Sequence, residues 1–183
     1  AAMYHASKKL DPTRPVHYHF ANEPLCCDVL GGGLTKKNQY ALSGRYASVP
    51  ELQSVLKSND HRPYLLNEFA HSMGNAMGSL KDYFDVFESS EVFAGGTVWD
   101  WVDQGIDGYT EDGRHYWGYG GDFGATMYTH DENFCCNGLV SPDRTPHPGL
   151  MEVKKVYQDV EFEYADGLLR IHNNMMFTNL NEF

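Results

Sequence analysis

The chain has 183 residues, enough for one domain with a sizeable core or for one domain and part of another. Hydrophobic residues make up 42% and charged residues 21%, the proportions of an ordinary globular protein. Lys and Arg number 14 against 25 Asp and Glu, a formal net charge of −11 with no basic run. This composition argues against nucleic acids and anionic membrane surfaces as partners, because both require a positive patch. No stretch approaches the ~20 apolar residues that span a bilayer.

The chain opens with a predicted helix and a predicted strand. Residues 1–10 have a helical pattern with no cap in front of it, which is typical of the middle of a helix in a longer protein. Residues 14–20 place Val and Tyr between proline and polar residues, as strands do. The glycine-rich stretch 30–34 predicts a loop. We therefore expect the chain to be a piece of a larger protein.

Two helix–strand units follow. Ser48 and Glu51 match a capping box and predict a helix that runs to about Lys57. Residues 62–69 predict the next strand. An amphipathic helix is expected within 76–90, where apolar residues recur at helical spacing, and a buried parallel strand over 93–102. The order is typical of an α/β fold with a parallel sheet.

The remaining chain changes character. The segment 103–145 is rich in Gly, Tyr and Asp with little regular pattern, and long irregular segments of this kind are often functional. A short helix is expected within 146–158. Alternation on both sides of an Asp-Gly pair predicts a hairpin near 160–172, and residues 175–180 predict a third strand. We place a domain boundary between residues 147 and 148, with an antiparallel β domain starting in 148–183.

Glu68 is the first candidate for chemistry. It ends an apolar run, and active residues of parallel α/β folds gather at the C-terminal ends of strands. A carboxylate at such a position more often makes a salt bridge or hydrogen bonds. It also suits a glycosidase, which uses two carboxylates to flank the scissile bond. His71 would ordinarily be a packed or surface residue, but beside a sugar pocket it would donate to hydroxyls. The aromatic content of 14% fits core filling or a sugar-binding surface.

Two further patterns concern aromatic rings and cations. Trp99 and Trp101 belong to the predicted strand, either as two core residues or with one lining a pocket while the other packs under a helix. Asp122, Asp131 and Asn137 offer oxygens to a hard cation, although such residues are usually turn formers.

The four cysteines form two adjacent pairs, Cys26–Cys27 and Cys135–Cys136. Neither pair matches a zinc spacing. We expect mostly buried thiols, and the redox compartment stays open.

Five motifs in order carry a family resemblance. They are DPTRPVHY, NEFAHSMGNAMG, GGTVWDWVDQG, YGGDFG and NFCCNGLVSPDRTPHPGLMEVKKVYQ. Together they resemble the large β-galactosidases of glycoside hydrolase family 2 over nearly the whole chain. The resemblance implies the C-terminal half of a (β/α)8 TIM barrel, followed by the first strands of an antiparallel β-sandwich. It also implies a retaining enzyme that cleaves terminal β-D-galactosides by double displacement.

The resemblance assigns roles where the motifs match. It implies that Glu68 is the catalytic nucleophile and that His71, Trp99 and Tyr46 bind substrate. In NFCCNG, the Phe134 carbonyl and the Asn137 side chain match ligands of a Na⁺ ion that contacts the sugar, which also makes Asn137 a substrate-binding residue. Mg²⁺ is implied too, with ligands outside this chain.

Departures and omissions limit these implications. His19 stands where the family commonly has Glu, and residues 20–44 match poorly, so no role is assigned there. Arg45 precedes Tyr46 where the family usually has Met. The acid/base glutamate of the family lies upstream of the position of Ala1. We therefore expect this chain alone to be inactive and the longer protein to be active.

Other classes stay open at this point. A sister glycosidase, such as a β-glucuronidase or β-mannosidase, would share much of the pattern, and so would a sugar-binding homologue without catalysis. The full-length protein is expected to be a cytoplasmic homo-oligomer whose partner is a β-galactoside. The preferred aglycone does not follow from the sequence.

Overall fold

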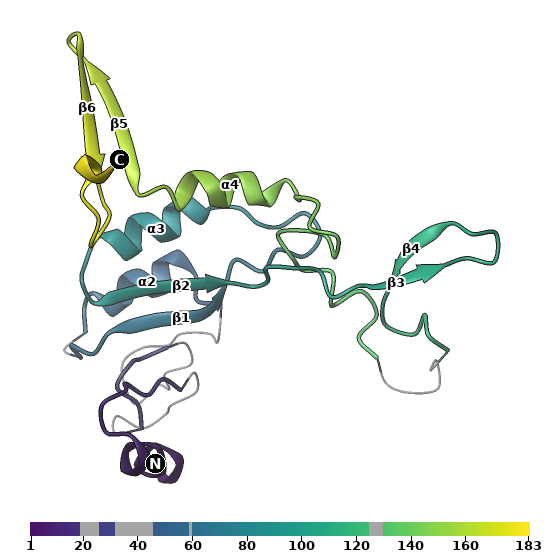
Figure 1. Cartoon of the computed structure of the whole chain (residues 1–183). Helices are drawn as coiled ribbons and strands as arrows, with labels where there is room; N and C mark the ends of the chain where they lie inside the picture. Colours follow the sequence, from purple (N-terminus) through teal and green to yellow (C-terminus); the bar gives the residue numbers. More distant parts are fainter. Residues whose placement is uncertain (19–25, 32–45, 59, 125–129) are drawn as a thin grey trace.

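A computed structural model describes the chain except for residues 19–25, 32–45, 59 and 125–129. A parallel pair of strands lies at its centre, and helices cover one side of the pair (Figure 1). Two hairpins project from this body in different directions, and the N-terminal helix lies on the side away from the other helices. The mixture of helices and strands expected of an α/β chain is therefore present, and the described sheets are all two-stranded.

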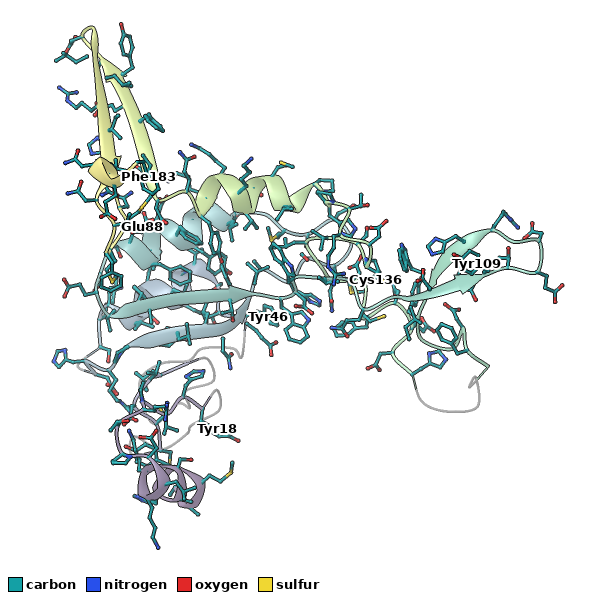
Figure 2. All side chains as sticks on the ribbon, in the orientation of Figure 1. Tyr18, Tyr46, Glu88, Tyr109, Cys136 and Phe183 are labelled. Carbon is teal, nitrogen blue, oxygen red and sulfur yellow. The ribbon has the colours of Figure 1, made fainter. Side chains whose placement is uncertain are left out.

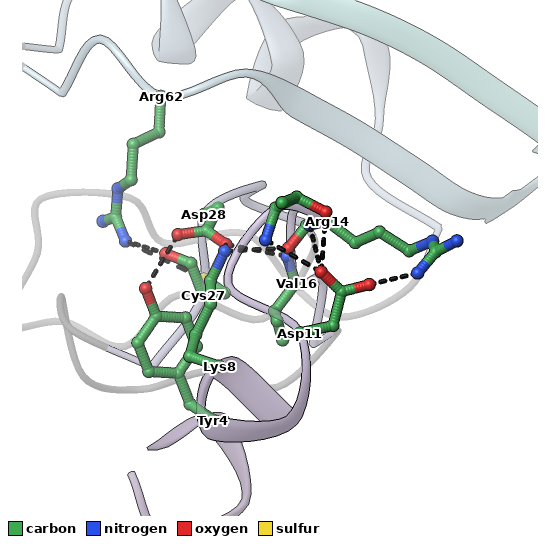
Figure 3. Close-up of polar contacts among 9 residues, drawn as sticks. Tyr4, Lys8, Asp11, Arg14, Val16, Cys27, Asp28 and Arg62 are labelled. Carbon is green, nitrogen blue, oxygen red and sulfur yellow. Dashed lines mark hydrogen bonds and ion pairs between the residues drawn. The ribbon is translucent and has the colours of Figure 1, made fainter. Parts of the chain in front are cut away.

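The first helix, α1 (Ala2–Leu10), forms as predicted and is held by Asp28. Lys8 Nζ lies 2.7 Å from Asp28 Oδ2, and the Tyr4 hydroxyl donates to Asp28 Oδ1 at 2.8 Å (Figure 3). The Val16 N–H donates to Asp28 Oδ2 at 2.8 Å. These hydrogen bonds, that of Lys8 first, lower the pKa of Asp28 to about 2. One carboxylate thus joins α1 to the segment that leads into the sheet.

The prediction of a strand over residues 14–20 is wrong for residues 14–18, which the structure describes. His17 forms only an isolated parallel bridge with Val29. The Val16 N–H is bound by the carboxylate of Asp28 rather than by a neighbouring strand, which ends the ladder after one bridge. His19 and Phe20 lie outside the described residues, as do most of the glycine-rich loop and Arg45.

The capping signal is confirmed at α2 (Val49–Val55). The Glu51 carboxylate accepts hydrogen bonds from the Ser48 N–H at 2.7 Å and from the Ser48 hydroxyl at 2.8 Å. The helix ends two residues before the predicted Lys57. Leu52 and Val55 point into the core. Local chemistry therefore starts the helix, and burial fixes which of its sides faces the sheet.

The central strands β1 (Tyr64–Phe69) and β2 (Phe93–Val98) are parallel, as predicted. Gly96 permits their close packing, because a Cβ there would lie 2.8 Å from the Phe69 ring. The core gathers around these strands. The largest of the fully buried side chains are Leu52, Tyr64, Leu66, Phe69, Leu80 and Asn137.

The second strand is shorter and less buried than predicted. It ends at Val98 rather than 102, and Ala94 and Thr97 are exposed. Among the described residues, β2 pairs only with β1, so one edge and part of one face remain open. The prediction of a fully buried strand is wrong for this reason.

The segment 103–145 contains a hairpin that the sequence analysis missed. The strands β3 (Ile106–Tyr109) and β4 (His115–Gly118) are antiparallel. Gly113 has φ +83°, and the Thr110 N–H donates to the Arg114 carbonyl at 2.9 Å across the turn. The Asp-Gly pair at 112–113 was the available signal.

Two further helices cover the sheet. They are α3 (Leu80–Glu88), which is shorter than its predicted span 76–90, and α4 (Gly149–Val156). The Leu80 N–H donates to Glu152 Oε1 at 3.2 Å, so α4 satisfies a free donor at the start of α3. The rings of Phe84 and Tyr157 pack with centroids 4.7 Å apart. The two helices therefore hold each other against the sheet.

The C-terminal hairpin forms as predicted, and the third strand does not. The strands β5 (Val160–Ala165) and β6 (Leu168–Asn173) pair antiparallel through a turn with φ 53° at Asp166 and φ 76° at Gly167. Residues 175–180 are not a strand, and a 3-10 helix, η2 (Leu180–Glu182), follows. The Asn173 side chain binds backbone groups of both Met175 and Thr178, which competes with strand pairing.

Candidate active site

The C-terminal ends of β1 and β2 position the candidate residues. Glu68 is the penultimate residue of β1, and Trp99 directly follows β2. The hydrogen-bond ladder continues past both ends. The Trp99 N–H donates to the Phe69 carbonyl at 3.0 Å, and the Ser72 N–H donates to the Trp99 carbonyl at 2.8 Å. The two loops therefore leave the sheet in a fixed relation to each other.

Tyr46 joins Glu68 and His71 although it lies 22 residues before Glu68. Its hydroxyl donates to Glu68 Oε2 at 3.2 Å. Its ring stacks on the His71 ring with centroids 5.7 Å apart and planes 27° apart. Glu68 and His71 are both partly buried. A carboxylate, a phenol and an imidazole thus meet at one strand end, a combination that can orient and hydrogen-bond a polar ligand.

His71 also contacts Phe134 from the distant C-terminal segment. The two ring centroids lie 5.4 Å apart with planes at 75°, an edge-on contact. His71 Nε2 is buried and has no hydrogen-bond partner among the described residues. A buried polar atom without a partner is costly, so such an atom at a strand end fits a group that a ligand satisfies.

Asn137 is 2% exposed and ties three segments together. Its carbonyl accepts from the Asp100 N–H at 2.7 Å and from the Ser72 hydroxyl at 2.5 Å. Its Nδ2 donates to the Phe134 carbonyl at 3.2 Å. The turn 134–137 is therefore anchored to the loops after both β1 and β2.

The same turn has a donor set that suits a hard cation. Asn137 Oδ1 is buried and accepts no hydrogen bond from the described residues. The Phe134 carbonyl keeps a second lone pair beside its bond to Asn137. Two neutral oxygens on one turn are ligands of the kind that such cations take. Phe134 and Asn137 therefore fit part of a cation site, with the remaining ligands to come from elsewhere.

Carboxylates elsewhere do not add to this donor set. Asp122 accepts a hydrogen bond from the Tyr119 N–H at 2.8 Å, the ordinary role of an aspartate in a turn. Within the part of the chain that the structure describes, no group of three or more His, Cys, Asp or Glu side chains is arranged to hold a metal.

Asp103 and His147 form a clamp on this turn that the sequence analysis missed. Asp103 Oδ1 accepts from the Gly138 N–H at 2.7 Å, and His147 Nδ1 bonds the Gly138 carbonyl at 3.1 Å. His147 Nε2 lies 3.5 Å from Asp103 Oδ2. A side chain at Gly138 would clash with the backbone of Val102 and Asp103. The motifs containing Asp103 and His147 were visible, but their contact joins residues far apart in the chain.

The cysteines differ from the prediction of mostly buried thiols. Cys27 is 4% exposed, whereas Cys26, Cys135 and Cys136 are partly exposed. Burial, followed by the neighbouring Cys135 thiol and Asp103, raises the pKa of Cys136 to about 11. The prediction fails because Cys135 and Cys136 occupy a surface turn rather than a helix or strand of the core.

The six residues to which the family resemblance assigns a role all lie at this end of the sheet. They are Tyr46, Glu68, His71, Trp99, Phe134 and Asn137. Trp99 is partly buried, whereas Trp101 is 58% exposed. Their proximity is a property of the fold, and their chemical roles remain predictions.

Comparison with known proteins identifies the family. The family described as "Glycosyl hydrolases family 2, TIM barrel domain" matches residues 1–162. The chain belongs to this family, and the match covers the helices and strands from α1 to α4. The resemblance drawn from the five motifs is thus confirmed.

Individual relatives agree with this assignment. A "Beta-galactosidase" of Vibrio cholerae is 42% identical over 191 residues, which cover 98% of this chain and 17% of the relative. A "Beta-galactosidase" of Photobacterium profundum is 43% identical over 154 residues, which cover 84% of this chain and 15% of the relative. This chain thus spans less than a fifth of the length of these relatives.

A solved structure of a GH2 beta-galacturonidase from Eisenbergiella tayi bound to glycerol is 17% identical to this chain. The match has a TM-score of 0.49 and covers 90% of this chain and 30% of the chain in that structure.

Among the described residues, no helix has the length and apolar character needed to cross a membrane.

Proposed function

We propose that this chain is the nucleophile-bearing part of a longer retaining β-galactosidase, which hydrolyses terminal β-D-galactosides by double displacement. The observation that carries the proposal is the cluster at the end of β1, where Tyr46 bonds Glu68 and stacks on His71. The relatives named Beta-galactosidase support the choice of sugar, at 42% and 43% identity.

In the first step of the proposed reaction, Glu68 attacks the anomeric carbon of the galactoside. A bond forms between a Glu68 carboxylate oxygen and that carbon while the bond to the leaving oxygen breaks. A general acid outside this chain protonates the leaving oxygen. The Tyr46 hydroxyl, 3.2 Å from Glu68 Oε2, orients the carboxylate and stabilises its charge before attack. The product of this step is a galactosyl ester of Glu68.

In the second step, water attacks the anomeric carbon and releases Glu68 as a carboxylate. The residue that acted as the acid now removes a proton from this water. The Tyr46 hydroxyl again favours the charged form of Glu68, which is the leaving group. The anomeric configuration is retained because the carbon is inverted twice.

His71 and Trp99 are proposed to bind the sugar. His71 Nε2 has no partner among the described residues, so it is available to a substrate hydroxyl. Trp99 lies directly after β2, where an indole ring would form a flat wall for the apolar face of a pyranose.

A Na⁺ ion would be held by the Phe134 carbonyl and Asn137 Oδ1, with further ligands from outside this chain. A cation there would supply a charge that binds a sugar hydroxyl, which would make Asn137 part of the substrate site. Mg²⁺ would bind through residues outside this chain. We further propose that the full-length enzyme is a cytoplasmic homo-oligomer.

The domain assignment is part of the same proposal. Residues 1–147 would form the second half of the barrel, and residues 148–183 would lead into a β-sandwich. The hairpin supports this division. Phe162 pairs with Ile171 and Tyr164 with Leu169, so apolar side chains share one face that a second sheet would cover.

Substitution of Glu68 in the full-length protein tests the proposed function. Glu68→Gln keeps the shape of the side chain and removes its charge, so hydrolysis of a nitrophenyl galactoside should fall by about 10⁴-fold or more. Glu88→Gln, an exposed residue at the end of α3, is the matched control and should keep full activity.

The choice of sugar is tested by comparing nitrophenyl galactoside, glucuronide and mannoside as substrates of the unmodified protein. If the protein prefers the glucuronide or the mannoside, the assignment changes from a β-galactosidase to a sister glycosidase. If none of the three substrates is hydrolysed, the result favours a sugar-binding homologue without catalysis.

A further inference from the structure

Two cysteines are adjacent in the turn that carries Phe134 and Asn137. Cys135 and Cys136 are reduced thiols, and both are partly exposed. Figure 2 shows Cys136 beyond the ends of β1 and β2, on the side of the molecule where Tyr46 also lies. The proposed mechanism gives neither thiol a role.

Backbone hydrogen bonds fix the position of both cysteines. The Cys135 carbonyl accepts from the Gln104 N–H at 2.9 Å, and the Cys136 N–H donates to the Asn133 carbonyl at 2.9 Å. The Cys135 thiol lies 3.7 Å from the Glu132 carbonyl in the same turn. The turn therefore presents two neighbouring sulfur atoms from a fixed backbone.

The second adjacent pair in the chain differs in access. Cys27 is 4% exposed, and Arg62 Nη1 lies 2.9 Å from its carbonyl and 3.8 Å from its Sγ (Figure 3). A reagent that must bond both sulfurs of Cys26 and Cys27 would have to displace Arg62. Of the two pairs, only Cys135–Cys136 has both residues partly exposed.

We propose that Cys135 and Cys136 form a dithiol site for trivalent organoarsenicals of the arsenoxide class, and that occupation of this site shuts down the neighbouring sugar site. Two As–S bonds form and the As–O bond breaks. The arsenoxide oxygen leaves as water with the two thiol protons, so arsenic stays trivalent and nothing is oxidised. Two thiols complete this chemistry, whereas a metal ion would require further ligands that the described residues do not provide.

The effect on the sugar site follows from the neighbours of the pair. Phe134 precedes Cys135 and packs its ring on His71, and Asn137 follows Cys136. Closing a ring through both sulfurs constrains this turn and places an organic group beside Phe134. A displacement of about 1 Å at a substrate-binding wall costs roughly 10²-fold in rate. Capture of the arsenical is independent of the proposed function, whereas the loss of turnover rests on it.

Treatment of the full-length protein with phenylarsine oxide tests the proposal. Peptide mapping by mass spectrometry should find one phenylarsenic unit bridging Cys135 and Cys136, with the loss of two hydrogens. Hydrolysis of nitrophenyl galactoside should fall by roughly 10²-fold. An added 1,2-dithiol should restore it, whereas the same concentration of a monothiol should not.

Three variants separate the possible causes, each compared with its own untreated rate. Cys135→Ser/Cys136→Ser should lose both the bridging adduct and the inhibition, and Cys136→Ser alone should do the same if the double variant fails to fold. Cys26→Ser/Cys27→Ser is the matched control and should stay sensitive.

Two results would overturn the proposal. One is the absence of a bridging adduct at Cys135–Cys136 in the unmodified protein. The other is full turnover with that adduct present. If the protein hydrolyses no galactoside at all, the proposed function fails, and the adduct alone then decides whether the dithiol site exists.

Discussion

The parallel pair β1–β2 and the hairpin β5–β6 are both two-stranded sheets, but different interactions hold them. The parallel strands are far apart in sequence and bury Tyr64, Leu66 and Phe69 under helices. The hairpin strands are joined by a two-residue turn, and every residue of β6 is exposed. The hairpin follows from local sequence, whereas the parallel pair depends on long-range packing. The candidate active site belongs to the second kind.

The largest difference is expected in stability. Leu66 is fully buried in β1, so Leu66→Ala should cost about 2–5 kcal/mol of the free energy of unfolding. Leu168, 60% exposed and paired with Ala165 on the polar side of the hairpin, is the matched control. Leu168→Ala should change the free energy of unfolding by no more than about 0.5 kcal/mol. Urea unfolding of the full-length variants measures both, and equal costs would contradict the comparison.

The next largest effect concerns the hydroxyl that reaches the end of β1. Tyr46→Phe removes the hydrogen bond to Glu68 and should lower kcat by about 10²-fold with little change in KM. Tyr109→Phe, in the exposed hairpin β3–β4, should change neither constant. Steady-state kinetics on a nitrophenyl galactoside separate the two. An unchanged kcat for Tyr46→Phe would show that the contact with Glu68 has no part in catalysis.

A smaller effect is expected from the clamp on the turn 134–137. His147→Ala removes a hydrogen bond to Gly138, and the resulting shift of Asn137 should raise KM about tenfold while kcat changes less. His115→Ala removes a comparable contact with Asp107 in the hairpin β3–β4 and should leave KM unchanged. A fall in kcat alone would contradict a positioning role for His147.

The smallest effect concerns acid stability. Because the folded-state pKa of Asp28 is about 2, below its ordinary value, its stabilisation is complete at neutral pH and is lost as pH falls toward 2. Asp28→Asn should therefore be less stable at neutral pH, and the gap should narrow between about pH 5 and about pH 3. Asp85→Asn, at an exposed i, i+4 pair, is the control. Urea midpoints measure the difference in stability between Asp28→Asn and the unmodified protein. A difference that grows as the pH falls would contradict the stabilising role of the ionised Asp28.

The sequence predicted the elements that local signals define. The capping box at Ser48, the amphipathic helix near Leu80 and the Asp166–Gly167 hairpin are all present. The predictions failed where side chains bind the backbone instead of letting strands pair. Asp28 does so at Val16. The hairpin β3–β4 was missed because its Asp-Gly turn lies in a stretch whose composition predicts irregular structure.

The site could be predicted only in part. Motif resemblance singled out Glu68 and His71, and the fold brings them together with Tyr46. The clamp formed by Asp103 and His147 could not be predicted, since it depends on a contact between segments 35 residues apart that only the folded chain creates.

Covalent trapping tests the central claim most directly. An activated 2-fluoro galactoside should label the full-length protein once per chain, and fragmentation of the labelled peptide should place the sugar on Glu68. No label should appear in Glu68→Gln. A label on another carboxylate, or labelling that persists in that variant, would contradict the assignment of Glu68 as the nucleophile.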